Sequence, residues 1–159
     1  MRFVVVQLIG CMTNNIEKRA FLRAARSKVW RAISDAEQFG TWFGVKFEGP
    51  FVAGAWLNGS ITDPPGYDKL AFSIQVVELR PETYFAYRWH PFAIDPSVDY
   101  SHEPTTLVEF ELADADGGCQ LTIRETGFDK IPAERRVKAR EMNDGGWAEQ
   151  MQRIEAYVA

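Results

Sequence analysis

The C-terminal stretch "PAERRVKAREMNDGGWAEQMQRIEAYVA" (132–159) decides the fold, because it predicts one long amphipathic helix. Pro132 suits a first-turn position, where its missing N–H is not needed. The residues that share one stripe follow at helical spacing: Val137, Asp144, Trp147, Met151, Ile154 and Val158. Gly145 and Gly146 each cost about 1 kcal/mol relative to Ala, so the helix either bends there or lies close to another element. The stripe predicts a sheet for the helix to cover.

The sheet is predicted by the segment 45–128, where apolar and polar residues alternate. Phe72, Ile74 and Val76, for example, share one face of a strand. Turn sequences such as "DPPG", "RPE" and "DADGG" separate the strands. The predicted strands lie at 45–49, 55–62, 70–79, 83–91, 105–112 and 119–128. We expect an antiparallel meander with one face open to water.

The residues before the meander predict one more strand and two short helices. Residues 16–24 alternate like a half-buried strand, and Ser27 and Asp35 are candidate N-caps of helices at 27–34 and 35–43. The whole order predicts an α+β fold. A curved antiparallel sheet of six to seven strands wraps around the long C-terminal helix, and two short helices after the first strand close one end.

The domain organisation follows from length and from the N-terminal residues. A chain of 159 residues without repeats or linkers predicts one domain, here 14–159, after an N-terminal extension, 1–13. The extension includes Leu8-Ile9-Gly10-Cys11, which resembles a bacterial lipoprotein box, but its apolar run is short and its basic region almost absent. We favour an extra edge strand, or an upstream start codon with Met12 as the more natural start.

Several short motifs resemble a known family. They are Ala25, Val29-Trp30, Ala32-Ile33-Ser34, Phe39, Trp42-Phe43, Glu125-Thr126-Gly127-Phe128 and Gly146-Trp147. With them, residues 14–158 resemble the START-like (SRPBCC) superfamily and, within it, the group named for the C-terminal domain of the activator of the heat-shock protein 90 ATPase. The resemblance implies a helix-grip, Bet v-like fold with a cavity between sheet and helix. The superfamily includes ligand carriers, cyclases, hydroxylase domains and co-chaperone domains, so the fold leaves function open.

The composition narrows the classes of partner. A formal charge of -4 argues against nucleic acid, which needs an electropositive face, and no apolar run approaches the ~20 residues of a membrane span. Cys11 and Cys119 are too few for a disulfide framework, so we expect a reducing compartment, the cytoplasm. The aromatic fraction of 13% suits a ring-lined interior.

Aromatic side chains and one carboxylate are the candidate ligand site in that cavity. The candidate wall residues are Trp56, Phe72, Tyr87, Trp89, Phe110, Trp147 and Met151; alternatively these side chains pack a solid core. Glu125 points inward by its parity with Leu121 and Ile123, and a buried carboxylate needs a partner or a ligand. Arg88, Tyr87 and Asn58 are the candidate partners, and a structural pair at the rim is the alternative.

The segment "HPFAIDPSVDYSHEPTT" (90–106) contains both histidines of the chain, His90 and His102, beside Glu103. The spacing matches no metal motif, and strand parity sends His90 to the convex face and His102 to solvent. We therefore predict no metal site and no catalytic residue. The connection is longer than a usual hairpin loop, which predicts a lid near Asp144 and Trp147. Its candidate lid residues are Phe92, Ile94, Val98 and Tyr100.

The resulting expectation is a domain that binds a small hydrophobic molecule or a lipid in the sheet–helix cavity, with Glu125 and Tyr87 holding the polar end. The first alternative is a protein-interaction module, a chaperone ATPase activator-like co-factor or stress-related partner that uses its outer surface. The second is a cyclase or dehydratase with a cavity acid, the less favoured class because no second titratable group converges on Glu125. No cofactor is predicted.

Overall fold

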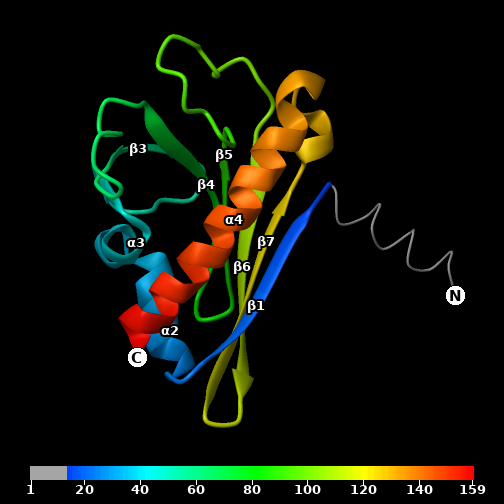
Figure 1. Cartoon of the computed structure of the whole chain (residues 1–159). Helices are drawn as coiled ribbons and strands as arrows, with labels where there is room; N and C mark the ends of the chain where they lie inside the picture. Colours follow the sequence, from blue (N-terminus) through cyan, green and yellow to red (C-terminus); the bar gives the residue numbers. More distant parts are fainter. Residues whose placement is uncertain (1–13) are drawn as a thin grey trace, which may run out of the picture.

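The computed structural model describes residues 14–159, which Figure 1 shows in chain order. The elements are β1 (Ile16–Leu22), α2 (Arg26–Ser34), α3 (Ala36–Phe43), β2 (Val45–Phe47), β3 (Trp56–Ile61), β4 (Phe72–Arg80), β5 (Tyr84–Trp89), β6 (Thr106–Ala115), β7 (Gly118–Thr126), η1 (Phe128–Lys130) and α4 (Ala133–Val158). The predicted α+β helix-grip fold is confirmed. The predicted extension, 1–13, lies outside the described residues.

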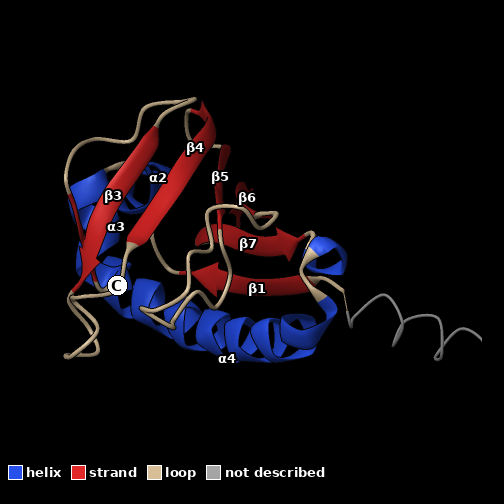
Figure 2. Ribbon diagram, turned by 90° about the horizontal axis from the view of Figure 1, so that it is seen from above, coloured by secondary structure: helices blue, strands red, loops and turns tan. Residues whose placement is uncertain are grey.

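The seven strands form one antiparallel sheet in the order β1-β7-β6-β5-β4-β3-β2. β2 to β7 form the meander, and β1 pairs with β7, so α2 and α3 connect the two edges of the sheet. α4 runs along the sheet beside β1 (Figure 2), and α3 packs against both β2 and α4. Across the covered face, Tyr87, Val108, Glu125 and Ile16 lie in register and are all buried. That row brings a carboxylate into the interior.

The two short helices begin in different ways. The carboxylate of Asp35 accepts hydrogen bonds from the backbone N–H groups of Glu37 (2.9 Å) and Gln38 (3.3 Å), which confirms Asp35 as the N-cap of α3. Ser27 does not cap α2. That helix begins at Arg26 after Ala25, which makes no side-chain cap bond, so Ser27 already lies inside the first turn.

Helix α4 is continuous over 26 residues, but its buried stripe differs from the prediction. Trp147, Met151, Ile154 and Val158 are buried as expected. Val137 is 67% exposed, and Ala139 faces the core instead. The predicted stripe is therefore wrong in the first half of the helix, where a small residue makes the contact. Asp144 pairs with Lys18 of β1 at 3.0 Å.

Gly145 and Gly146 do not mark a close approach of α4 to another element. A Cβ atom built at either position meets no heavy atom within 4 Å, and the helix continues through both residues. That part of the prediction is wrong. Because an added methyl group would lie in open space, the two glycines lower the helix propensity of α4 without relieving a steric clash.

Aromatic rings fill the space between the sheet and the helices. Phe39 of α3 lies at the centre, with its ring centroid 4.7 Å from that of Trp42 and 6.4 Å from that of Tyr87. Phe43, Phe47, Phe51, Phe85 and Phe110 also contact Phe39. We call the set the ring cluster. It continues towards α4 through Trp89 and Trp147, whose ring centroids are 5.7 Å apart.

We predict that Gly145→Ala and Gly146→Ala each stabilise the protein by up to about 1 kcal/mol, because Ala restricts the unfolded chain and favours the helix. Urea unfolding followed by circular dichroism measures the change. Gly40→Ala is the matched control, since its Cβ would lie 2.1 Å from the carbonyl oxygen of Val45 and should destabilise. Lower stability of both α4 variants would contradict the prediction.

Candidate functional site

The predicted wall residues other than Trp56 lie in the interior, buried or partly buried. Tyr87 and Trp89 have ring centroids 5.2 Å apart, and the Phe110 and Trp147 centroids are 5.8 Å apart. Phe72 contacts Trp89 at 6.2 Å, and Met151 belongs to the same buried core. These side chains therefore form one continuous apolar wall between the sheet and α4.

Trp56 lies on the opposite, outer face of the sheet, so its predicted place on the wall is wrong. Its side chain is 49% exposed and stacks on His90 with 9° between the ring planes. The physical reason is strand parity. Leu57, not Trp56, pairs with the inward-facing Ile74, and Trp56 pairs with Gln75 instead.

Glu125 is fully buried near the end of β7, and four neutral donors surround its carboxylate. Oε1 accepts from Trp147 Nε1 at 2.8 Å and from Asn143 Nδ2 at 2.9 Å. Oε2 accepts from Trp89 Nε1 at 2.7 Å and from Thr106 Oγ1 at 2.6 Å. We call these four donors and the carboxylate the Glu125 cage. The cage joins β5, β6, β7 and α4.

Glu125 lies inward as its parity predicts, but the predicted partners Arg88, Tyr87 and Asn58 make none of these bonds. Arg88 is exposed on the outer face, one residue before Trp89. The two tryptophans were predicted only as apolar wall, although a buried indole N–H normally finds an acceptor. Asn143 and Thr106 were missed. A signal for Asn143 existed, since it lies one helical turn before Trp147 and so on the same face of α4.

The cage holds the carboxylate without any positive charge. Burial raises the pKa of Glu125 above its ordinary value, while the hydrogen bonds from Thr106, Trp89, Trp147 and Asn143 oppose that rise. None of these four partners titrates as an acid or base. The acceptor capacity of both oxygens is in use, so Glu125 offers no free lone pair to a ligand or metal ion.

Tyr87, unlike Glu125, has a buried polar group that is unsatisfied within residues 14–159. Its side chain is 1% exposed, and its hydroxyl has no hydrogen-bond partner among residues 14–159. Burial, and secondarily the nearby charge of Glu125, raise the pKa of Tyr87 well above its ordinary value, so the hydroxyl stays protonated. An unpaired hydroxyl in an apolar interior costs about 1–3 kcal/mol, which makes Tyr87 the unsatisfied polar group of the ring cluster.

The predicted lid, 90–106, contains the connection 90–105 between β5 and β6, and Arg135 holds this connection to the first turn of α4. The guanidinium donates from Nη2 to Glu103 Oε1 at 2.6 Å, from Nη1 to the carbonyl of Phe92 at 3.0 Å and from Nη2 to that of Pro91 at 3.2 Å. It also stacks over the ring of Tyr100, 4.8 Å from the centroid. The contacts that hold the loop therefore come from the start of α4 rather than from Asp144 and Trp147.

The four candidate lid residues divide into two pairs. Phe92 packs against the core, and Tyr100 is half-buried under Arg135. Ile94 is 47% exposed and Val98 is 46% exposed, so the expectation that they bury is wrong. The reason is that Arg135 fixes the two ends of the loop, which leaves its middle outside the packed interior.

The histidines stand apart from the interior. His90 Nε2 lies 3.1 Å from the carbonyl oxygen of Glu103, and His102 is exposed, 3.6 Å from Asp99. Within 14–159 we find no group of three His, Cys, Asp or Glu side chains that could hold a metal ion. No helix of that range has both the length and the apolarity to cross a membrane.

The larger hollow lies at the α3 end of the ring cluster, with a volume of about 950 Å³. It opens between α2 and α3 on one side and β2 with the following loop on the other. Arg31, Lys46 and Glu48 are among its polar residues, and Phe47 and Phe51 line its apolar part. The Phe47 and Phe51 rings contact each other at 5.1 Å, and Phe51 stacks on Phe85 at 5.1 Å. The hollow therefore meets the ring cluster directly.

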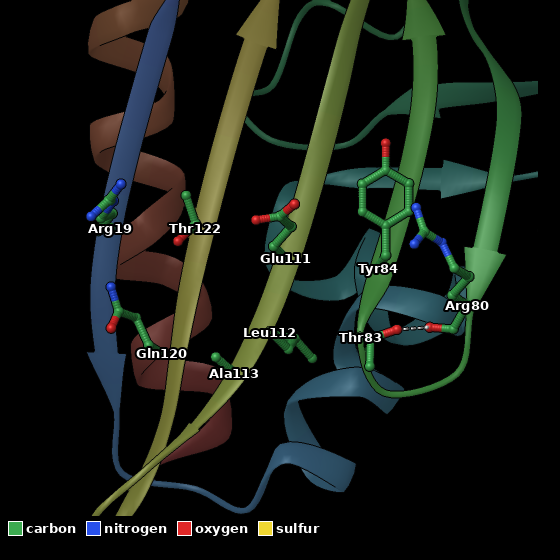
Figure 3. A pocket seen from close by; sticks show the side chains of 9 residues that line it. All are labelled: Arg19, Arg80, Thr83, Tyr84, Glu111, Leu112, Ala113, Gln120 and Thr122. Atoms are coloured by element: carbon green, nitrogen blue, oxygen red, sulfur yellow. Dashed lines mark hydrogen bonds between the residues drawn. The ribbon is translucent and has the colours of Figure 1, made fainter.

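A smaller hollow, about 360 Å³, lies on the outer face of the sheet (Figure 3). Its charged residues are already paired. Arg124 binds Glu111 at 2.9 Å, and the hydroxyl of Tyr84 donates to Glu109 at 2.5 Å. Arg80 lies over the Tyr84 ring, 4.3 Å from its centroid. With these charges compensated, this hollow has less to offer a ligand than the hollow beside Phe47.

We predict that Glu125→Gln destabilises the protein by about 1–3 kcal/mol at neutral pH, because an amide turns one acceptor of the cage into a donor that faces other donors. The advantage of the wild type should grow as the pH falls towards 4.5. The pKa of Glu125 is higher in the folded protein than in the unfolded protein. The contribution of Glu125 to stability is therefore present at low pH and is lost as the pH rises through the folded pKa. Urea unfolding across pH measures the difference, with exposed Glu155→Gln as the control. A difference independent of pH would refute it.

We predict that Arg135→Lys loosens the loop, because an ammonium group cannot hold the carboxylate and both carbonyls at once. Amide hydrogen exchange should become faster in residues 91–103 and stay unchanged in β6 and β7. Arg136→Lys is the matched control, since the Arg136 guanidinium donates to the carbonyl of Ile131 and, within residues 14–159, makes no hydrogen bond to the loop. Unchanged exchange in the loop of the Arg135 variant would show that other contacts hold it.

Solved structures show where else this fold occurs. A protein from Arthrobacter aurescens is 19% identical with a TM-score of 0.73, and the match covers 92% of this chain and 86% of that one. A protein from Mesorhizobium loti is also 19% identical with a TM-score of 0.70, covering 91% and 96%. The Aha1 dimer from Colwellia psychrerythraea is 13% identical with a TM-score of 0.66, covering 91% and 95%. At these identities the likeness shows the fold alone.

Family membership comes from the sequence itself. No curated protein matches the chain. The family model described as "Activator of Hsp90 ATPase homolog 1-like protein" matches residues 23–159, from the residue after β1 to the residue after α4. The match spans most of the chain and includes the Glu125 cage and both hollow-forming helices. The chain belongs to the family of Activator of Hsp90 ATPase homolog 1-like proteins.

Proposed function

We propose that this domain binds a small, mostly apolar molecule at the α3 end of the ring cluster. The observation that carries the proposal is the hollow of about 950 Å³, whose apolar part is formed by Phe47 and Phe51. Its volume is within the range of small-molecule sites, and its apolar part lies beside polar residues that include Arg31, Lys46 and Glu48. The proposed site differs in place from the one that the sequence led us to expect between sheet and C-terminal helix.

Ring-to-ring contacts connect the hollow with the interior. Phe51 stacks on Phe85 at 5.1 Å, and Phe85 contacts Tyr87 at 5.8 Å. Phe51 belongs to the loop between β2 and β3, so its ring can turn away without breaking strand pairing. A flat apolar ligand that replaced Phe51 against Phe85 would keep the aromatic contacts and bury its own surface, at ~25 cal/mol per Å².

Glu125 has a structural role in this proposal. Its four donors leave no acceptor for a ligand, in contrast to the polar end that its position suggested. The cage orients the indoles of Trp89 and Trp147, which form the far wall of the interior. The four hydrogen-bond partners of Glu125 do not titrate, and Tyr87 is a nearby titratable group whose pKa is raised by burial and by the charge of Glu125.

Protein interaction is the second candidate, and Trp56 is the observation that favours it. A tryptophan that is 49% exposed and stacked on His90 is a suitable anchor for a protein partner. The Aha1 structure from Colwellia psychrerythraea is described as a dimer, which makes a second copy of the chain a partner to consider. Analytical ultracentrifugation of the wild type and of Trp56→Ala separates this function from ligand binding.

We predict that Phe47→Ala weakens binding of 2-acetylnaphthalene about two- to tenfold, because it removes one aromatic face of the hollow. Quenching of tryptophan fluorescence gives the affinity, and circular dichroism checks the fold. Phe21→Ala, on an exposed ring of β1 outside the hollow, is the matched control and should leave affinity unchanged. Native mass spectrometry of protein from its own host should also detect a bound small molecule. Equal affinities in both variants would rule out the hollow as the site.

A further inference from the structure

Among residues 14–159, the buried side-chain atoms without a hydrogen-bond partner include Arg26 Nε, Arg140 Nε, Gln150 Oε1 and the hydroxyl of Tyr87, and the last of these belongs to a side chain of the ring cluster. Trp89, Trp147 and Thr106 all direct their donors to Glu125. The hydroxyl of Tyr87, on the same row of the sheet as Glu125, has no partner among residues 14–159 although the side chain is 1% exposed. Buried polar groups are nearly always hydrogen-bonded, and an exception calls for an explanation.

The Tyr87 ring lies among other aromatic rings, and its partners on the neighbouring strands are Val76 and Val108. Its ring centroid lies 5.8 Å from that of Phe85, 6.2 Å from Phe110, 5.2 Å from Trp89 and 6.4 Å from Phe39. None of these neighbours has an acceptor for the hydroxyl. Phe85 and Phe39 also contact Phe51 at the hollow, at 5.1 and 5.6 Å. Tyr87 therefore lies behind one layer of rings as seen from the hollow.

We infer that the Tyr87 hydroxyl donates a hydrogen bond to a neutral oxygen of the bound molecule, a carbonyl or an ether, and so selects planar apolar ligands that carry one such oxygen. The inference rests on the proposed function and adds the chemical class of the ligand. In a buried hydroxyl, an O–H group without an acceptor costs more free energy than an unused lone pair of the same oxygen. The missing hydrogen bond is therefore the one that the hydroxyl would donate.

The same geometry disfavours an anionic ligand. The interior around Tyr87 contains the carboxylate of Glu125, which is held by four neutral donors and by no Lys or Arg. A buried anion needs a cation or several free donors; beside Tyr87 one hydroxyl is free, while Arg31 and Lys46 line the hollow on the other side of the layer of rings. A carboxylate-bearing analogue of a good ligand should therefore bind much more weakly than the ketone of the same shape.

Three naphthalenes of nearly equal size test the inference: 2-acetylnaphthalene with a ketone, 2-ethylnaphthalene without oxygen, and 2-naphthoate with an anion. Affinities of the wild type and of Tyr87→Phe are measured by isothermal titration. We expect Tyr87→Phe to weaken binding of the ketone about tenfold, a loss of about 1.4 kcal/mol, and to leave binding of 2-ethylnaphthalene unchanged. The wild type should bind 2-naphthoate at least tenfold more weakly than the ketone.

Thermal unfolding without ligand supplies the second measurement. If the hydroxyl is unsatisfied in the protein, Tyr87→Phe should unfold at the same temperature as the wild type or higher, whereas most buried substitutions lower it. A clear fall in the unfolding temperature would mean that the hydroxyl already has a partner, and would overturn the inference.

The outcomes separate the two proposals. If both neutral naphthalenes bind and Tyr87→Phe weakens them equally or not at all, the role of Tyr87 is wrong and the proposed function stands. If the ketone alone loses affinity, both stand. If none of the three probes binds to the wild type, the proposed function fails and the role of Tyr87 fails with it.

Discussion

The interaction on which the rest of the structure depends is the buried carboxylate of Glu125 with its four donors. An ionised group in an apolar interior is tolerated only when its lone pairs are satisfied. Within residues 14–159, the hydrogen-bond partners of this carboxylate are neutral donors, which come from β5, β6 and α4 at once. The long helix can therefore lie on the sheet in only one register, with Asn143 and Trp147 above the end of β7. The cage sets the position of the helix in a way that apolar contacts, which lack direction, do not.

Two buried polar groups of the interior, Glu125 and Tyr87, differ in their hydrogen bonding. Glu125 is saturated and orients the indoles, while Tyr87 two strands away is left with a free hydroxyl. Glu125, whose lone pairs are all in use, stabilises the fold, whereas the free hydroxyl of Tyr87 is the group that we propose for ligand recognition. We propose that a ligand binds at the hollow beside Phe47 and Phe51, and Tyr87 lies one layer of rings behind that hollow.

A second set of polar contacts lies beside the cage, because the loop that Arg135 holds connects Trp89 and Thr106, two donors of the cage. Arg135 binds the carboxylate of Glu103 and two backbone carbonyls of the same loop, so a single side chain of α4 fixes both ends of the 90–105 connection. The arrangement makes α4 the common support of the cage and of the loop. Ile94 and Val98, in the middle of the candidate lid, remain exposed, whereas Arg135 holds its two ends.

The sequence by itself determined the elements, their order and the inward direction of Glu125, because the period of a strand or helix is a local property of neighbouring residues. Only the tertiary structure decided which groups meet. The donors to Glu125 lie from 18 to 36 residues away along the chain, and their convergence depends on how α4 crosses the sheet. The same holds for Trp56, which lies on the outer face because Leu57 is the inward-facing residue of β3, and for Val137 in the first half of α4, which is exposed to solvent. Alternation predicts which residues share a face, whereas the pairing of distant strands and the packing of the helix decide which face is inside and what each side chain touches there.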